Sequence, residues 1–174
     1  MKSVKQLLLL LLLLAPPVFA EDLSERIRQA AIAMTEAYLR QDSKALVQYT
    51  AEPLVRRAGG AEAMAAKIQA EFESNRKENI RLVSYSFIKP DRIHYVQGTL
   101  FALIERKSQW QLPSQSMNLR YNVLAVSTDG GTTWRFAEAS AISEDVFRTL
   151  FGFFDAQLFS EFYQYTSERT GCKK

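Results

Sequence analysis

The sequence predicts one α+β domain in which helices pack on one face of a curved antiparallel sheet. Apolar residues recur at helical spacing in the first half of the chain, and branched and aromatic residues dominate from Ile80 onwards, a composition typical of strands. The composition is 47% hydrophobic and 24% charged with only 7 Gly and 5 Pro, which excludes a disordered or low-complexity chain.

Residues 1–20 resemble a secretory signal peptide. Two lysines precede an unbroken leucine run over residues 7–14, and Pro16-Pro17 and a small Ala20 follow. The run is too short to span a bilayer, so we expect cleavage after Ala20 rather than an uncleaved anchor helix. The sequence therefore predicts an exported, periplasmic protein with no membrane attachment after signal cleavage.

Charge and rare residues exclude several kinds of site. The formal net charge is +3, from 22 Lys plus Arg against 19 Asp plus Glu, and losing Lys2 and Lys5 leaves 20 − 19, or +1. That is too little for a nucleic-acid binder of this size. Cys172 is the only cysteine and His94 the only histidine, so we expect no intramolecular disulfide, no metal site of the zinc kind and no cofactor. Cys172 is expected on a frayed tail, with a disulfide between two chains as the alternative.

Three helices are expected before the sheet. Apolar spacing predicts the first over residues 23–40, and Asp42 is a suitable N-cap for a second over residues 44–49, which Pro53 would end. Gly59-Gly60 precedes a third over residues 61–75, rich in good helix formers.

Four strands are expected to follow. Residues 80–88 and 92–106 form the first two, separated by a turn at Lys89-Pro90-Asp91. A polar break over residues 108–116 precedes alternation over residues 117–125, whose odd positions should face the core. A turn over residues 127–133 leads to a fourth strand that begins at Trp134 and returns alongside the third.

An aromatic helix is expected from Ser143 to beyond Leu158. We divide the chain into a signal peptide (1–20), the α+β domain (21–140) and a C-terminal helical extension and tail (141–174).

Both faces of the predicted strand over residues 92–106 are partly apolar. The face away from the helices therefore needs a cover: the aromatic segment, a second subunit or a ligand. We expect a homodimer through this sheet face.

The chain resembles the nuclear-transport-factor-2-like (NTF2-like) superfamily, which includes SnoaL-type cyclases and ketosteroid isomerases. The resemblance rests on Ala37-Tyr38-Leu39-Arg40-Gln41-Asp42 with Leu46 and Tyr49, on Gly59-Gly60, and on the order of elements. The resemblance implies a cone-shaped fold with a pocket between the helices and the sheet, and it also implies a dimer, because members of this family commonly form dimers.

The catalytic residues of the isomerase-like members do not carry over. The carboxylate that follows the second helix is replaced by Val55-Arg56-Arg57-Ala58, and Met34 stands where a tyrosine is expected. Asp91, His94 and Glu105 are the only candidates for a relocated base or acid.

Residues 127–134 read Ser-Thr-Asp-Gly-Gly-Thr-Thr-Trp and resemble the Asp-box hairpin of sialidases. Turn chemistry explains Ser127, Asp129, Gly131 and Trp134: the aspartate accepts from amides of its own turn, a glycine takes positive φ, and the tryptophan folds over the turn. We therefore interpret these four residues as structural rather than as a sugar site.

The sequence favours a non-enzymatic module that binds a small apolar or anionic ligand or a protein partner. Candidate ligand-binding residues are Tyr38, Arg56, Arg57, Arg120 and Tyr121. Two alternatives stay open: an enzyme of the cyclase, isomerase or dehydratase kind, and a structural subunit of a cell-envelope assembly that docks through residues 151–165.

Overall fold

The computed structural model describes residues 18–138, 143–151, 160–163 and 165–171. Most of the expected signal peptide, the end of the aromatic segment at residues 152–159 and Cys172 lie outside the described residues. None of the helices in the described ranges is both long enough and apolar enough to cross a membrane.

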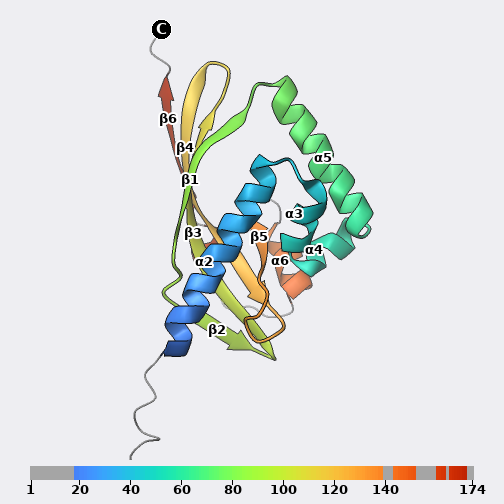
Figure 1. Cartoon of the computed structure of the whole chain (residues 1–174), viewed down its shortest axis with the longest axis vertical. Coiled ribbons are helices and arrows are strands. Elements are labelled where there is room, and N and C mark those ends of the chain that lie inside the picture. Colours follow the sequence, from blue (N-terminus) through green and yellow to red (C-terminus); the bar gives the residue numbers. More distant parts are fainter. Residues whose placement is uncertain (1–17, 139–142, 152–159, 164, 172–174) are drawn as a thin grey trace, which may run out of the picture.

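Four helices precede the sheet, in the order shown in Figure 1: α2 (Val18–Leu39), α3 (Ser43–Tyr49), α4 (Glu52–Arg57) and α5 (Ala61–Lys77). Asp42 caps α3 as expected, with its carboxylate accepting from the amide of Ala45 at 3.0 Å. The expectation of three helices was wrong because Pro53 begins α4 rather than ending α3, in the first turn where proline is tolerated.

Six strands of the described chain form one curved antiparallel sheet: β1 (Arg81–Ile88), β2 (Ile93–Val96), β3 (Thr99–Gln111), β4 (Gln115–Ser127), β5 (Arg135–Glu138) and β6 (Tyr165–Gly171). The two long strands β3 and β4 lie at the centre. β1 and β2 pair with successive parts of β3, and β6 and β5 pair with successive parts of β4.

The expected single strand over residues 92–106 is instead a hairpin. Gln97 and Gly98 have φ of 48° and 84°, as a two-residue turn of the hairpin type requires, and they reverse the chain between β2 and β3. Val96 therefore pairs with Thr99 and shares the face of Phe101, whereas the single strand would have placed it with Leu100. β3 also continues to Gln111, so the polar break is only residues 112–114.

α2 packs across one face of the sheet, called here the helix-facing side. Ile27 and Ala31 are fully buried against strand residues such as Ile104, Val123 and Phe136. A small alanine at the contact lets the helix axis approach the sheet closely.

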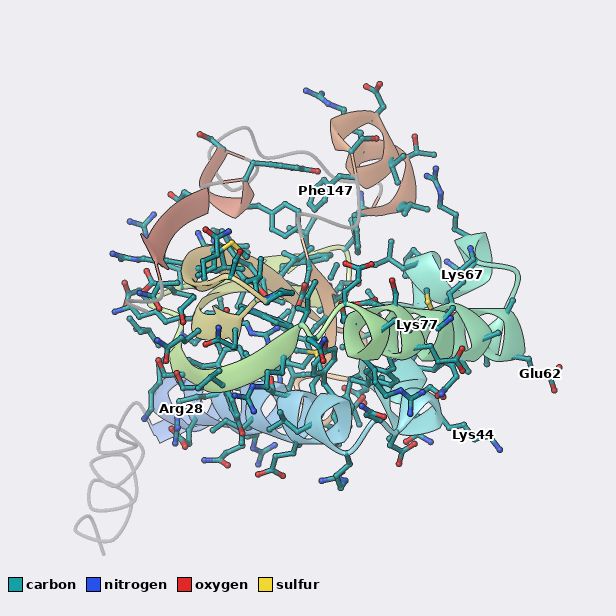
Figure 2. All side chains as sticks on the ribbon, turned by 90° about the horizontal axis from the view of Figure 1, so that it is seen from above. Arg28, Lys44, Glu62, Lys67, Lys77 and Phe147 are labelled. Atoms are coloured by element: carbon teal, nitrogen blue, oxygen red, sulfur yellow. The ribbon has the colours of Figure 1, made fainter. Side chains whose placement is uncertain are left out.

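The opposite side, called here the outer side, is covered near β5 by the C-terminal segment. Phe147 of α6 (Glu144–Phe151) and Phe162 are buried against Phe101 and Leu124. Figure 2 shows Phe147 on the side of the sheet opposite to α2. Of the covers considered from the sequence, the aromatic C-terminal segment is thus present, because its aromatic residues fold back over the apolar end of the sheet.

The expectation of a helical extension followed by a frayed tail was wrong for residues 165–171, which form β6 and pair with β4 along Gln115–Tyr121. β5 pairs only with residues 123–126 of β4, so the neighbouring stretch of that strand still offers unpaired backbone groups. Pairing satisfies these groups even though the sequence of β6 lacks apolar alternation.

Candidate functional site

A cavity of about 270 Å³ lies between the helices and the helix-facing side of the sheet. Helices α2, α3, α4 and α5 and strands β3, β4 and β5 contribute to its wall. The lining residues are Met34, Thr35, Tyr38, Leu46, Tyr49, Thr50, Leu54, Met64, Ile68, Glu71, Arg106, Trp110, Tyr121, Phe136 and Glu138. Most of these side chains are apolar or aromatic, as is usual for a small-molecule pocket.

Three neighbouring strands bring a polar cluster into this cavity. Arg106 on β3 lies opposite Tyr121 on β4, and Glu138 ends β5 beside Val123 of β4. Arg106 Nη1 donates to Glu138 Oε1 at 2.8 Å, and the Tyr121 hydroxyl lies 3.5 Å from the same oxygen. The guanidinium also lies over the rings of Phe87 and Tyr121, 5.9 and 5.8 Å from their centroids.

Burial distinguishes the two members of the ion pair. The side chain of Arg106 is 6% exposed, whereas that of Glu138 is 36% exposed. The buried Nε–H of Arg106 has no hydrogen-bond partner among the described residues. A buried donor without a partner is costly, and because this nitrogen is closed to solvent it does not open into the cavity that Arg106 lines.

The electrostatic setting keeps the tyrosines protonated. Burial, followed by the Glu138 carboxylate, raises the pKa of Tyr121 well above its ordinary value. Burial and the nearby Glu71 likewise raise the pKa of Tyr38. The pKa of Glu71, an exposed residue at the cavity rim, is raised by loss of water and by Glu138.

Tyr38 and Tyr121 are the two sequence-predicted binding residues that the structure brings into the cavity. Arg56 and Arg57 are exposed on α4, where Arg56 pairs with Glu52 at 2.8 Å. Arg120 is also exposed and lies on the outer side, next to Tyr121 in the sequence but on the opposite face.

The three catalytic candidates do not meet. Glu105 lies on the outer side, 2.6 Å from Arg120, and Asp91 is exposed in the turn between β1 and β2. His94 is half-buried on β2 opposite Phe101. None of the three lines the cavity. In the described ranges, no group of three or more His, Cys, Asp and Glu side chains is placed to hold a metal ion.

The sequence interpretation missed Arg106, Glu138 and Trp110. Arg106 was taken as the end of a strand, although it continues the alternation of Ala102 and Ile104 on the buried side of β3. A charged residue in phase with buried positions is the signal that would have indicated it.

The Asp-box-like turn lies away from the cavity and is closed by its own hydrogen bonds. Asp129 accepts from the amide and hydroxyl of Thr133 at 2.9 and 2.6 Å, and the Ser127 hydroxyl accepts from Gly131 N at 2.9 Å. Gly131 has φ +89°, and Trp134 is buried in the core beside α2. These contacts account for Ser127, Asp129 and Gly131 as parts of a turn, whereas Trp134 packs into the core.

Comparison of the chain with protein-family models, with curated proteins and with solved structures finds no match.

Proposed function

We propose that this protein is a non-enzymatic small-ligand-binding module whose ligand occupies the 270 Å³ cavity. The observation that carries the proposal is the cavity itself, which is lined mostly by apolar and aromatic side chains and has the almost fully buried Arg106 in its wall. A compact, mostly apolar molecule with one carboxylate or carbonyl acceptor fits this combination. The charge-assisted bond would orient the ligand while the aromatic walls supply most of the burial.

The experiment uses a panel of small carboxylates led by 3-phenylpropionate, with the matching alcohols as uncharged partners. Trp110 lines the cavity and is one of two tryptophans, so a Trp134→Phe background makes fluorescence report on the cavity alone. We expect quenching by the carboxylates and a rise in the thermal midpoint. Arg106→Met should weaken carboxylate binding by about tenfold or more, whereas Arg120→Met on the outer side should leave it unchanged.

A second variant protects the test against poor folding of Arg106→Met. Ile68→Phe places a larger side chain in the cavity from α5, so that less space is left for a ligand, and leaves the ion pair intact. It should reduce binding of carboxylates and alcohols alike. The proposal fails if no member of the panel changes fluorescence or the thermal midpoint at millimolar concentration, or if both cavity variants bind like the parent protein.

The proposal extends to fold family, location and assembly. The order of helices and strands and the cavity between them support an NTF2-like cone, and the sequence of residues 1–20 supports export to the periplasm with cleavage after Ala20. Mass spectrometry of the protein recovered from a periplasmic extract tests the cleavage, because the mature chain would begin at Glu21.

We also propose a homodimer, held through a polar region of the outer side. The part of the outer side next to β1 carries polar side chains, among them Ser84, Ser86, Lys107, Gln109 and Asn118. A dimer through this region would be held by hydrogen bonds rather than by an apolar core. Analytical ultracentrifugation over a range of concentrations tests it.

One observation favours a catalytic alternative of the isomerase or dehydratase kind. A carboxylate, Glu138, and the hydroxyl of Tyr121 lie in the same cavity, and such reactions need a base together with a hydrogen-bond donor. Turnover of a bound ligand that is lost in Glu138→Gln, with binding retained, would establish this alternative.

A further inference from the structure

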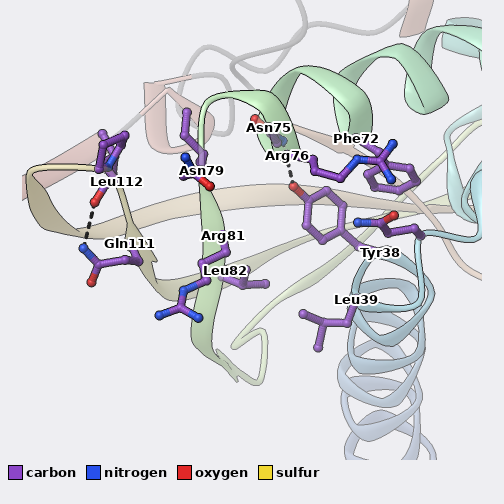
Figure 3. Close-up of a pocket in the computed structure, with 13 residues that line it drawn as sticks. Tyr38, Leu39, Phe72, Asn75, Arg76, Asn79, Arg81, Leu82, Gln111 and Leu112 are labelled. Atoms are coloured by element: carbon purple, nitrogen blue, oxygen red, sulfur yellow. Dashed lines mark hydrogen bonds between the residues drawn. The ribbon is translucent and has the colours of Figure 1, made fainter.

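A second hollow of about 610 Å³, called here the outer groove, lies beyond the cavity. The C-terminal ends of α2 and α5, the start of β1 and the turn between β3 and β4 form its walls (Figure 3). Its lining includes five aliphatic or proline side chains, and one of them, Leu39, is 50% exposed. These are Leu39, Ile80, Leu82, Leu112 and Pro113.

The charge of the outer groove has one sign. Among the described residues, Arg76 in the last turn of α5 and Arg81 at the start of β1 are its two charged lining residues, and no described carboxylate lines it. Neither arginine makes an ion pair within the described part of the chain. Asn75, Asn79 and Gln111 add amide groups to the same walls. The outer groove is thus complementary to an anionic group with some apolar surface beside it.

Tyr38 separates the outer groove from the cavity, because it alone of the residues that the structure describes lines both. Its ring meets Phe72 of the outer groove and Trp110 of the cavity edge-on, with centroids 5.2 and 5.9 Å apart. Its hydroxyl accepts a hydrogen bond from Asn75 Nδ2 at 3.1 Å, seen in Figure 3. A side-chain rotation of Tyr38 would have to break this hydrogen bond and both ring contacts.

We infer that the cavity and the outer groove form one elongated site for a linear molecule with an acceptor at each end. One end binds the guanidinium of Arg106, the chain passes the aromatic residues around Tyr38, and an anionic end lies between Arg76 and Arg81. This inference rests on the proposed function, because it takes the cavity as the site of the first end. Straight-chain α,ω-dicarboxylates are the simplest members of this ligand class.

The test compares dicarboxylates from adipate to dodecanedioate with monocarboxylates of the same length. We expect the dicarboxylate affinity to pass through a maximum at one chain length and there to exceed that of the monocarboxylate by about tenfold or more. The double variant Arg76→Gln/Arg81→Gln should remove this advantage and leave monocarboxylate binding unchanged. The matched control is Arg56→Gln/Arg120→Gln, which removes two exposed arginines elsewhere.

Arg76 lies in the last turn of α5, where its positive charge stabilises the negative end of the helix dipole. Replacing it could therefore destabilise α5, so a second variant tests the outer groove without changing Arg76. Pro113→Glu places a negative charge at an exposed position of the outer groove and should repel the second carboxylate only. Tyr38→Phe keeps the ring but loses the bond to Asn75, and it should speed association of the dicarboxylate alone.

The outcomes separate the two ideas. Dicarboxylates that bind no tighter than monocarboxylates, or an advantage that survives both outer-groove variants, would overturn the elongated site and leave the proposed function standing. Equal association rates for the parent protein and Tyr38→Phe would overturn the displacement of Tyr38. If no monocarboxylate binds to the parent protein, the proposed function itself is overturned.

Discussion

Arg106 and Glu138 lie 32 residues apart in the chain and meet at 2.8 Å on the helix-facing side of the sheet. The arginine is almost fully buried, whereas about a third of the glutamate side chain reaches solvent. This asymmetry leaves the guanidinium dependent on protein groups, because water reaches mainly the carboxylate end.

Arg106→Met is expected to lower the free energy of unfolding by about 2 kcal/mol, less than for a fully buried pair because Glu138 can still be hydrated. The double variant Arg106→Met/Glu138→Gln should recover part of this loss, since it removes the unpaired carboxylate. Urea denaturation of both single variants and the double variant measures the coupling. A double variant less stable than Arg106→Met would contradict the importance of this pair.

Gly131→Ala should destabilise the protein by about 2 kcal/mol, through positive φ and through a collision of the new Cβ with Leu23 Cδ2. Gly130 also has positive φ, but a Cβ there meets nothing within 4 Å. Gly130→Ala is therefore the matched control and should cost about 1 kcal/mol. Thermal unfolding in a Leu23→Ala background should remove the excess loss of Gly131→Ala, and an undiminished excess would show that the collision is not its cause.

The hydrogen bonds to Asp129 lower the pKa of its carboxyl from 3.8 to about 2. Because the folded-state pKa is the lower one, the stabilisation is fully present above about pH 4 and is lost as the pH falls towards 2. The difference in thermal midpoint between the parent protein and Asp129→Asn should therefore be constant at neutral pH and shrink in that acidic range. Asp91→Asn, in an exposed turn, serves as the control, and a gap that widens on acidification would contradict the assignment.

Phe147→Ala should lower the free energy of unfolding by about 3–4 kcal/mol, because the ring is 1% exposed and covers the apolar end of the outer side. Leu39→Ala, at a half-exposed position, should cost much less. The loss measured by urea denaturation should not depend on protein concentration if the cover is intramolecular. A loss that does depend on concentration would instead support a second subunit on this face.

The helices were largely predictable because their signals are local. The Asp42 cap, the Gly59-Gly60 turn and the apolar spacing of α2 and α5 act over four or five residues. α5 begins at the expected residue and ends two residues later than expected, whereas α2 ends one residue early and begins five residues before the expected start, within the expected signal peptide. α4 was missed for an equally local reason, since Pro53 is compatible with ending a helix or beginning one.

Two residues of the candidate site were also within reach of the sequence, since Tyr38 and Tyr121 were named from it. Arg120 was named as well, but the alternation of β4 places it on the outer side with Glu105. The choice between adjacent residues such as Arg120 and Tyr121 depends on which face the helices cover, and that is a tertiary property.

The sequence by itself determined the class of fold, the antiparallel sheet and the residues that form the Asp129 turn, because neighbours along the chain decide these features. Only the tertiary structure decided that Arg106, Tyr121 and Glu138 share one cavity, since their meeting depends on the register of β3, β4 and β5. It also decided that residues 165–171 become β6, because a free stretch of β4 supplies the hydrogen bonds that their own sequence does not announce.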